Sequence, residues 1–397
     1  MSIQAVKTML PRTVVVLSLV SLLNDAASEM ITPLLPVFLT LALGASPAAV
    51  GLIEGLAEAT SSILKLVSGR LADRGWNPKR LVVWGYGTSN MVRPLIGLAL
   101  SWPFVLSLRF LDRLGKGLRT APRDAMIANS VSAPRRGAAF GFHRAMDHLG
   151  AVIGPVVAFL VLSHGVEMRN VFLMSVVPGI AVLLLLVFGL PASQPQAIAV
   201  TPLKWSLLDG RLKALIIASG GLALASMPEA FLVLWALGRG IELQYIPLVW
   251  AAASLVKMFV AFLGGAASDR LGRLPVVITG WSLRVGCLFL IAGLGQGDAL
   301  TWIMFLVFAA SLAFTEAAER SLVGDAADPA QRGTAFGLYH LVCGLLALPG
   351  AVLIGAVWQG FGQAAAFMLA GSLTGLAAAA LVLISRGLGH SRENSGG

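Results

Sequence analysis

Apolar residues fill twelve long runs of this 397-residue chain, separated by short polar or charged connections. About 20 consecutive apolar residues suffice to cross the hydrocarbon core of a bilayer as a helix. The pattern therefore predicts an all-α membrane protein. Its twelve expected transmembrane helices are 13–41, 47–69, 81–100, 103–127, 137–163, 169–191, 212–237, 246–268, 274–295, 300–324, 333–358 and 363–385.

Two short motifs return at a fixed offset of 196 residues. Gly69–Arg74 resembles Gly265–Arg270, and Arg136–Gly141 resembles Arg332–Gly337. Self-similarity at one offset indicates two halves of similar build. Parallel halves in a chain this apolar are typical of secondary transporters, whose site lies between the halves.

The repeat and the polar stretch between the sixth and seventh runs predict the domain organisation. We expect an N-terminal six-helix bundle at 1–191, a cytoplasmic linker at 192–211, a C-terminal six-helix bundle at 212–386 and a disordered tail at 387–397. The two bundles are expected to be pseudo-symmetric.

Composition and charge exclude several other classes of protein. The chain is 57% hydrophobic and 12% charged, whereas soluble domains carry about 25% charged residues. Sixteen of the 29 Lys and Arg residues lie in alternate connections and the tails, counting Lys213 at the start of the seventh expected helix, against Arg169 and Arg239 in the opposite connections. This bias predicts an inner (plasma) membrane protein with both termini in the cytoplasm, and it argues against a nucleic-acid partner despite the net charge of +10.

Nothing in the chain resembles the common catalytic motifs. A nucleotide-binding loop, a Gly-x-Ser-x-Gly elbow and a metalloprotease pattern are all lacking. We therefore expect neither an enzyme nor a bound cofactor, and we expect a monomer in the bilayer.

Three motifs in their expected helices resemble those of the major facilitator superfamily, over about residues 10–385. The first, Gly-x-x-x-Asp-Arg, occurs twice, and its first copy departs from the family pattern after Arg74. The second is Arg113-Leu-Gly-Lys-Gly117, similar to a cavity-facing arginine motif linked to proton coupling. The third, Gly150-x-x-x-Gly154-Pro155, resembles the signature of antiporters, although Ala158-Phe159 replaces the Gly-Gly that ends the family signature.

The resemblance implies roles for these residues. The gate-motif residues are Gly69, Asp73, Arg74, Asp124, Gly265, Asp269, Arg270 and Arg273, and the hinge residues are Gly150, Gly154 and Pro155. Asp73 would meet the helix start near Gly333, Asp269 the start near Gly137, and Asp124 would pair with Arg74. A carboxylate is stabilised at such a helix start by backbone N–H groups and the helix dipole.

Ionisable residues inside the expected helices are candidates for function, because a charge at bilayer depth is unfavourable. The candidate cavity and proton-coupling residues are Asp25, Glu29, Glu54, Glu58, Arg93, Arg109, Arg113, Asp147, Glu229, Lys257, Arg284 and Glu316. A carboxylate beside a cation stays ionised, and without one in an apolar cavity it takes up a proton more readily. Asp25 or Glu29 is therefore the expected proton carrier, with Arg113 as its partner.

The leading hypothesis is a proton-coupled exporter of a small organic molecule such as a drug, metabolite or siderophore-like compound. One alternative is proton-coupled uptake of an anionic solute, bound by Arg93, Arg109, Arg113, Lys257 or Arg284. A divalent-metal exporter is a weaker alternative, because His143 and His148 diverge on their helix. A receptor or scaffold with the same fold would have lost the gate motifs, which are present here in both halves.

Overall fold

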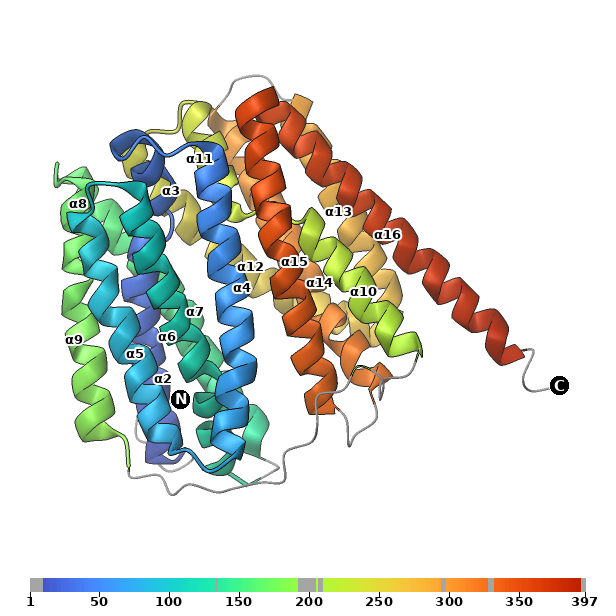
Figure 1. Cartoon of the computed structure of the whole chain (residues 1–397), viewed down its shortest axis with the longest axis horizontal. Helices are drawn as coiled ribbons and strands as arrows, with labels where there is room; N and C mark the ends of the chain where they lie inside the picture. The colour runs from blue at the N-terminus through green and yellow to red at the C-terminus, as the bar shows by residue number, and fades with distance from the viewer. Residues whose placement is uncertain are drawn as a thin grey trace. The chain divides into compact units, whose positions relative to one another are not determined.

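A computed structural model describes residues 10–132, 135–191, 205, 210–293, 298–327 and 332–393. The structural elements are helices: α2 (Arg12–Ile31), α3 (Leu35–Val37), η1 (Phe38–Ala42), α4 (Pro47–Asp73), α5 (Pro78–Leu95), η2 (Ile96–Leu98), α6 (Trp102–Asn129), α7 (Arg136–Ser163), α8 (Met168–Met174), α9 (Val176–Leu184), η4 (Leu185–Gly189), α10 (Gly210–Ala225), α11 (Glu229–Gly238), η6 (Leu243–Tyr245), α12 (Ile246–Leu271), α13 (Arg273–Gly293), α14 (Asp298–Ala326), α15 (Arg332–Phe361) and α16 (Gln363–Glu393). Each of the twelve expected spans corresponds to one or more of these helices (Figure 1).

Some expected spans are interrupted, and proline explains the clearest case. The seventh span divides into α10 and α11 around Pro228, which is the residue before the first turn of α11. Proline has no N–H to donate and disfavours helical geometry in the residue before it. The first span divides in the same way into α2, α3 and η1, with Pro33 between α2 and α3.

The chain divides into two compact units. Unit 1 holds the described residues of Met1–Gly44, Thr60–Val200 and Glu242–Ser254, and unit 2 holds those of Ala45–Ala59, Thr201–Ile241 and Leu255–Gly397. Each unit therefore takes one short segment from the other half of the sequence. The expected linker at 192–211 lies almost wholly outside the described residues, and α16 continues to Glu393, beyond the expected start of the tail.

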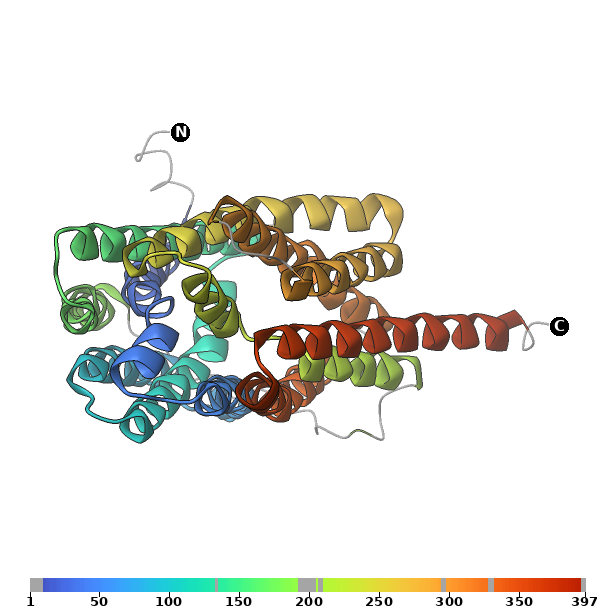
Figure 2. The ribbon, with the colours of Figure 1, turned by 90° about the horizontal axis from the view of Figure 1, so that it is seen from above.

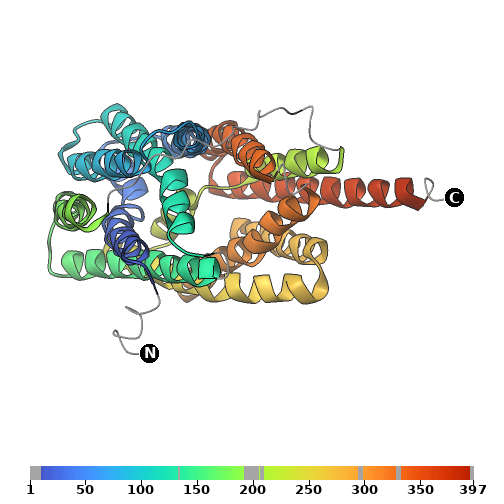
Figure 3. The same cartoon turned by 90° about the horizontal axis from the view of Figure 1, so that it is seen from below.

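In unit 1, α2 packs along α7, and α5 packs along α6 (Figure 3). Fully buried side chains between α2 and its neighbours include Leu17, Val82 and Ile127. Helix α5 starts sharply because the side chain of Asn77 accepts a hydrogen bond from the backbone N–H of Arg80, and Pro78 takes the first helical position.

In unit 2, α10 lies against α15 and α16, and α13 lies against α14 and α16 (Figure 2). One core joins Leu222 of α10, Trp281 of α13 and Ala318 of α14. The packing thus repeats the pattern of unit 1, with α10, α13, α14 and α15 in the places of α2, α5, α6 and α7.

Glycine contacts repeat between the units at the offset found in the sequence. A Cβ atom on Gly154 would lie 2.3 Å from the backbone oxygen of Ala26, and one on Gly350 would lie 2.1 Å from that of Leu224. Both glycines allow close approach of two helix backbones. The expected hinge residues Gly150 and Gly154 are therefore tight packing positions between α7 and α2.

Among the described residues, nine helical stretches are long and apolar enough to cross a membrane. The expected spans in α4, α5 and α6 fall outside that set. Helix α6 explains the difference best, because it carries five basic and two acidic residues. These charges are buried in the protein to a large extent, and they form the first part of the candidate site.

Candidate functional site

Unit 1 contains a buried polar network that joins α2, α5 and α6. The Arg93 Nε donates to Asp112 Oδ1 at 2.9 Å, and the Arg93 Nη1 donates to Asn24 Oδ1 at 2.9 Å. The Asn90 Nδ2 donates to the same Asn24 oxygen at 3.3 Å. Asp112 is 1% exposed and Arg93 4%, so the pair is almost fully removed from solvent and lipid.

Other arginines of α6 surround Asp112. Arg109 Nη1 lies 3.7 Å and Arg113 Nε 3.8 Å from Asp112 Oδ2. Arg119 donates to Ser89 Oγ at 2.7 Å, and its guanidinium lies 4.3 Å from the ring centre of Tyr86. One carboxylate thus compensates several buried cations, as a buried charge requires.

The two carboxylates expected to carry the proton lie one helical turn apart on α2. Asp25 Oδ1 accepts from Asn24 Nδ2 at 3.0 Å, which links Asp25 to the Arg93–Asp112 pair through one amide side chain. Glu29 Oε2 accepts from Trp250 Nε1 at 2.8 Å. Both carboxylates are half-buried, so each lies in surroundings where its protonation state affects its neighbours.

Asp147 of α7 lies between two possible partners. Its Oδ1 is 3.7 Å from His143 Nε2 and its Oδ2 is 3.6 Å from Arg144 Nη1. His143 is 1% exposed, and its Nδ1 lies 3.5 Å from Ser18 Oγ. No group of three or more His, Cys, Asp or Glu side chains in the described part of the chain is placed to hold a metal ion. The divalent-metal alternative therefore gains no support there.

Unit 2 contains a cavity of about 370 Å³ between α10, α11, α12, α13, α14 and α15. Its lining residues are Ser219, Leu222, Ala223, Ser226, Glu229, Lys257, Arg284, Leu312, Ala313, Glu316, Glu319, Tyr339 and Cys343. Four residues predicted from the sequence meet here: Glu229, Lys257, Arg284 and Glu316. The Lys257 Nζ and Glu229 Oε1 form an ion pair at 2.5 Å.

The other charged residues of this cavity differ in their contacts. Glu316 Oε1 accepts from Arg320 Nη2 at 2.6 Å, and Glu319 Oε1 accepts from Trp281 Nε1 at 2.7 Å. Arg284 is 4% exposed, and its Nη2 lies 3.4 Å from the backbone oxygen of Ser311 and 3.3 Å from Thr315 Oγ1. Its Nε has no hydrogen-bond partner within the described residues.

Two predicted residues lie on the part of α4 that belongs to unit 2, whereas the Arg93–Asp112 network belongs to unit 1. Glu54 is half-buried and Glu58 is exposed, and both belong to unit 2. Between them Gly55 packs directly on Leu348 of α15. The i,i+4 spacing of the two carboxylates therefore places them beside a tight contact between α4 and α15.

The second copy of the gate motif forms a charged network inside unit 2. Arg273 pairs with Asp269 and lies 3.4 Å from Asp325 Oδ2, and it donates to Ser268 Oγ at 2.8 Å. Arg270 is exposed. Asp269 is therefore stabilised by the cation that follows it by one turn.

The first copy is described less fully, because the side chain of Asp73 lies outside the described residues. Asp124, for which the sequence suggested Arg74, instead pairs with Arg123 at 2.9 Å. Arg123 also reaches Ser21 Oγ of α2 at 3.4 Å, so it is held close to Asp124, whereas Arg74 is exposed. A Cβ atom added to Gly69 would lie 3.5 Å from the Cβ of Ala121, and one added to Gly265 would lie 3.7 Å from the Cβ of Ala317. The two copies of the motif therefore have similar surroundings at this glycine.

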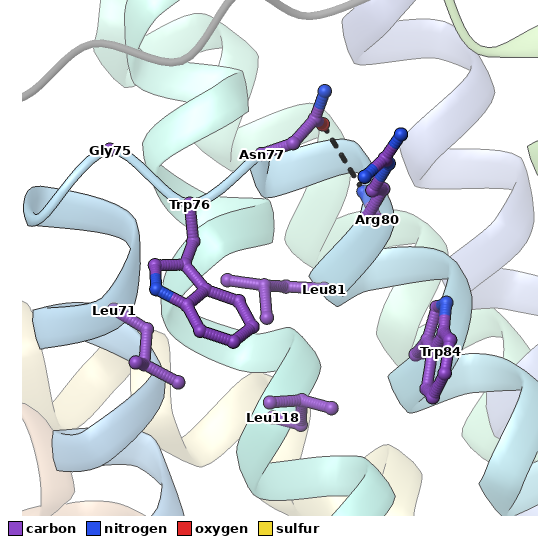
Figure 4. A pocket seen from close by; sticks show the side chains of 8 residues that line it. All are labelled: Leu71, Gly75, Trp76, Asn77, Arg80, Leu81, Trp84 and Leu118. Carbon is purple, nitrogen blue, oxygen red and sulfur yellow. Dashed lines mark hydrogen bonds between the residues drawn. The ribbon is translucent and has the colours of Figure 1, made fainter.

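The residues that follow Arg74, where the first motif copy departs from the family pattern, line a cavity. Figure 4 shows Trp76 and Arg80 beside a cavity of about 710 Å³, which is also lined by Leu71, Gly75, Asn77, Leu81, Trp84 and Leu118. Gly75 has φ of 89° and so provides the sharp turn between α4 and α5. Trp76 follows this turn directly after the end of α4, and its side chain lines the cavity.

The sequence identified several charged members of both clusters, but its candidate residues did not include Asp112, Arg119 or Glu319, and it missed the neutral partners. Asn24, Asn90 and Ser89 of unit 1 and Thr315 of unit 2 carry many of the hydrogen bonds. Each is a polar residue inside an apolar run, which is a weak signal on its own. Spacing alone did not indicate that Asn24 would contact Arg93, 69 residues away.

Comparisons with known proteins agree with this architecture. The model of the Major Facilitator Superfamily matches residues 17–347 and, in a second match, 238–396. An uncharacterized MFS-type transporter of Methanocaldococcus jannaschii is 32% identical over 363 residues, which cover 88% of this chain and 89% of the relative. A probable 4-methylmuconolactone transporter of Cupriavidus pinatubonensis is 30% identical over 164 residues, 41% of this chain and 38% of that protein.

Among solved structures, a bacterial homologue of the human lysosomal transporter Spinster, in an inward-facing and occupied conformation, has the same fold. It superposes with a TM-score of 0.77 at 18% identity, covering 94% of this chain and 96% of the other. The chain belongs to the Major Facilitator Superfamily of membrane transporters.

Proposed function

We propose that this protein is a secondary transporter that works by alternating access and exports a small organic molecule in exchange for protons. It acts in the inner (plasma) membrane as a monomer, with both termini in the cytoplasm. The gate motifs of the two halves, including Asp73 and Asp269, control access from the cytoplasmic side, and the closely packed α2–α7 pair moves as one body.

The observation that carries the proton-coupling part is the link between Asp25 and the Arg93–Asp112 pair. Asn24 donates to Asp25 through Nδ2 and accepts from Arg93 through Oδ1. Protonation of Asp25 removes the negative charge that holds the Asn24 amide group in this orientation. Reorientation of the Asn24 amide group would then alter its hydrogen bond with the buried Arg93 of α5, so protonation of Asp25 affects Arg93 through the hydrogen-bond network.

Glu29 provides a second carboxylate on the same face of α2. Its contact with Trp250 brings in a helix from the other half of the sequence. A proton that exchanges between Asp25 and Glu29 needs to move by only one helical turn. We propose that either carboxylate carries the coupled proton. The sequence suggested Arg113 as the cationic partner, but Arg113 lies 3.8 Å from Asp112, and the cations that act electrostatically on Asp25 are Lys116 and Arg119.

A second candidate function is proton-coupled uptake of an anionic solute. The buried Arg284 in the unit 2 cavity favours it, because an arginine binds a carboxylate or phosphate through two parallel hydrogen bonds. The relative described as a probable 4-methylmuconolactone transporter supports a small organic substrate in either direction.

Purified protein in liposomes tests the proposal. An imposed pH gradient and an internal pH dye report proton movement on addition of organic cations, organic anions, siderophores and divalent metals. Proton movement opposite to the flux of a compound supports antiport, and movement in the same direction supports uptake. A complete lack of coupled flux with this panel would contradict proton coupling.

Variants locate the proton carrier. Asp25→Asn and Glu29→Gln are compared with Glu242→Gln, which changes an exposed carboxylate that contacts Gln244. We expect one of the first two to lose coupled proton movement while binding is retained. Full proton-driven transport by both would remove these residues from the mechanism.

A further inference from the structure

The candidate anion-binding cations differ in whether a carboxylate already compensates them. Arg93, Arg109 and Arg113 share Asp112, and Lys257 pairs with Glu229. A cation held by a carboxylate must give up that partner before it can bind a substrate anion. The ion pairs therefore argue against these four residues as the primary anion receptor.

Arg284 is the exception among these candidates. Its printed hydrogen bonds go to a backbone carbonyl and a threonine hydroxyl, both neutral. Glu319 of the same cavity acts on Arg284 electrostatically, but among the described residues the two form no direct ion pair. The Arg284 Nε has no hydrogen-bond partner there, and the residue is 4% exposed. A buried guanidinium without a directly paired carboxylate is unfavourable, so this position calls for a functional reason.

The carboxylates of the same cavity are already engaged. Glu229 accepts from Lys257, Glu316 from Arg320 and Glu319 from Trp281. An organic cation would have to displace one of these donors. An organic anion meets a guanidinium whose Nε–H has no hydrogen-bond partner among the described residues.

We propose that Arg284 is the anion receptor of the unit 2 cavity and that the transported substrate is a small organic anion with a carboxylate or phosphate group. This inference rests on the proposed transport function and specifies its substrate class, independently of the direction of transport. The negative group lies against the Arg284 guanidinium, and the body of the substrate lies on the apolar part of the cavity, formed by Leu222, Ala223, Leu312 and Ala313.

The volume limits the substrate to a compact molecule. A cavity of about 370 Å³ is at the small end of the usual range of 300–1,000 Å³ for ligand sites. A single-ring acid fits this space better than a long peptide or a large siderophore.

Binding is measured on the full-length protein in detergent, with four probes that share a phenyl ring and differ in charge. They are benzoate, phenyl phosphate, benzylamine and benzyl alcohol, and thermal unfolding reports the stabilisation by each. We expect benzoate or phenyl phosphate to raise the unfolding temperature, and the more effective of the two identifies the preferred anionic group. Benzylamine and benzyl alcohol are expected to have little effect.

Three variants assign the effect. Arg284→Gln should weaken anion binding at least about tenfold, because it removes charge-assisted hydrogen bonds. Arg284→Lys keeps the charge but loses the planar fork, so binding should be intermediate. Arg239→Gln, which removes a cation elsewhere in unit 2, should bind like the wild type.

The outcomes separate this inference from the proposed function. Equal anion binding by the wild type and Arg284→Gln would overturn the assignment of Arg284. Preference of the wild type for benzylamine or benzyl alcohol, or no binding of any probe, would overturn the anionic substrate class. If the inference fails in either of these ways, coupled flux of other compounds in liposomes would still support the proposed transport function. The proposed function itself fails if no compound of the full panel gives coupled flux.

Discussion

Arg93 and Arg284 are both 4% exposed, and each lies in one of the two related halves of the protein. Arg93 is held by Asp112 and Asn24, and two further arginines share the same carboxylate. Arg284 has neutral contacts and borders a cavity. The difference teaches that burial of a charge does not by itself indicate its role, and that the charge of its neighbours separates a structural arginine from a substrate-binding one.

The strongest way to break this comparison is to remove the shared carboxylate. Asp112→Asn leaves Arg93, Arg109 and Arg113 without that compensation, and such an uncompensated buried charge costs about 3–5 kcal/mol. We expect a large loss of folded protein, measured by the yield of monodisperse protein and the thermal unfolding midpoint in detergent.

The matched control is Glu316→Gln, because Glu316 and Arg320 are about half exposed, at 53% and 48% of their side chains. Removal of that pair should change stability by about 0–1 kcal/mol. Wild-type stability of Asp112→Asn would contradict the structural role of the unit 1 network.

A second test asks whether the units differ only in electrostatics. Gly154→Ala and Gly350→Ala place a Cβ atom 2.3 and 2.1 Å from a backbone oxygen, so each should destabilise its unit by about 1–3 kcal/mol. Gly154→Leu should in addition abolish transport. Thermal unfolding and liposome flux measure these effects.

Gly141→Ala and Gly286→Ala are the controls, because nothing lies within 4 Å of a Cβ added at either position. They should be neutral or slightly stabilising, since alanine favours a helix more than glycine does. If Gly154→Ala and Gly350→Ala lower the free energy of unfolding by clearly different amounts, the close backbone packing of the two units is not equivalent.

A third test compares the two arginines directly. Arg284→Met removes a buried cation that has no direct ion pair with a carboxylate among the described residues. The free energy of unfolding should therefore stay the same or rise by about 1 kcal/mol, and the thermal unfolding midpoint should change in the same direction. Arg93→Met should lower both. If Arg284→Met destabilises the protein as much as Arg93→Met does, Arg284 has a structural role as well.

The smallest effect is expected for the ion pair between Glu229 and Lys257. Its side chains are 27% and 26% exposed, so solvent weakens the attraction. A double-mutant cycle with Glu229→Gln and Lys257→Met should give a coupling of about 0.5–1 kcal/mol in thermal stability. A coupling as large as that of Arg93 with Asp112 would place this pair among the structural charges too.

The hydrophobic pattern predicted where the helices lie, although the spans in α4, α5 and α6 are outside the set that is long and apolar enough to cross a membrane. The repeat predicted the similar build of the halves. The interruptions followed less well, because the effect of Pro33 or Pro228 depends on where the chain must bend. Arg93, Arg109 and Arg113 were identified as candidates, but their shared carboxylate Asp112 and the neutral partner Asn24 were not, since Arg93 meets these residues only through the packing of α5 on α6 and α2. The pairing of Asp124 was wrong for the same reason: local distance on one helix outweighed the family pattern.

The charge of α6 has a consequence for biosynthesis. Each charged residue at the centre of an isolated helix opposes insertion by about 2.5–3.5 kcal/mol, and α6 carries five basic and two acidic residues. Such a segment cannot enter the bilayer favourably on its own as it leaves the ribosome. Because Arg93 of α5 pairs with Asp112 of α6 across a short connection, we expect the two segments to be released into the lipid together, as a hairpin in which this buried ion pair has already formed.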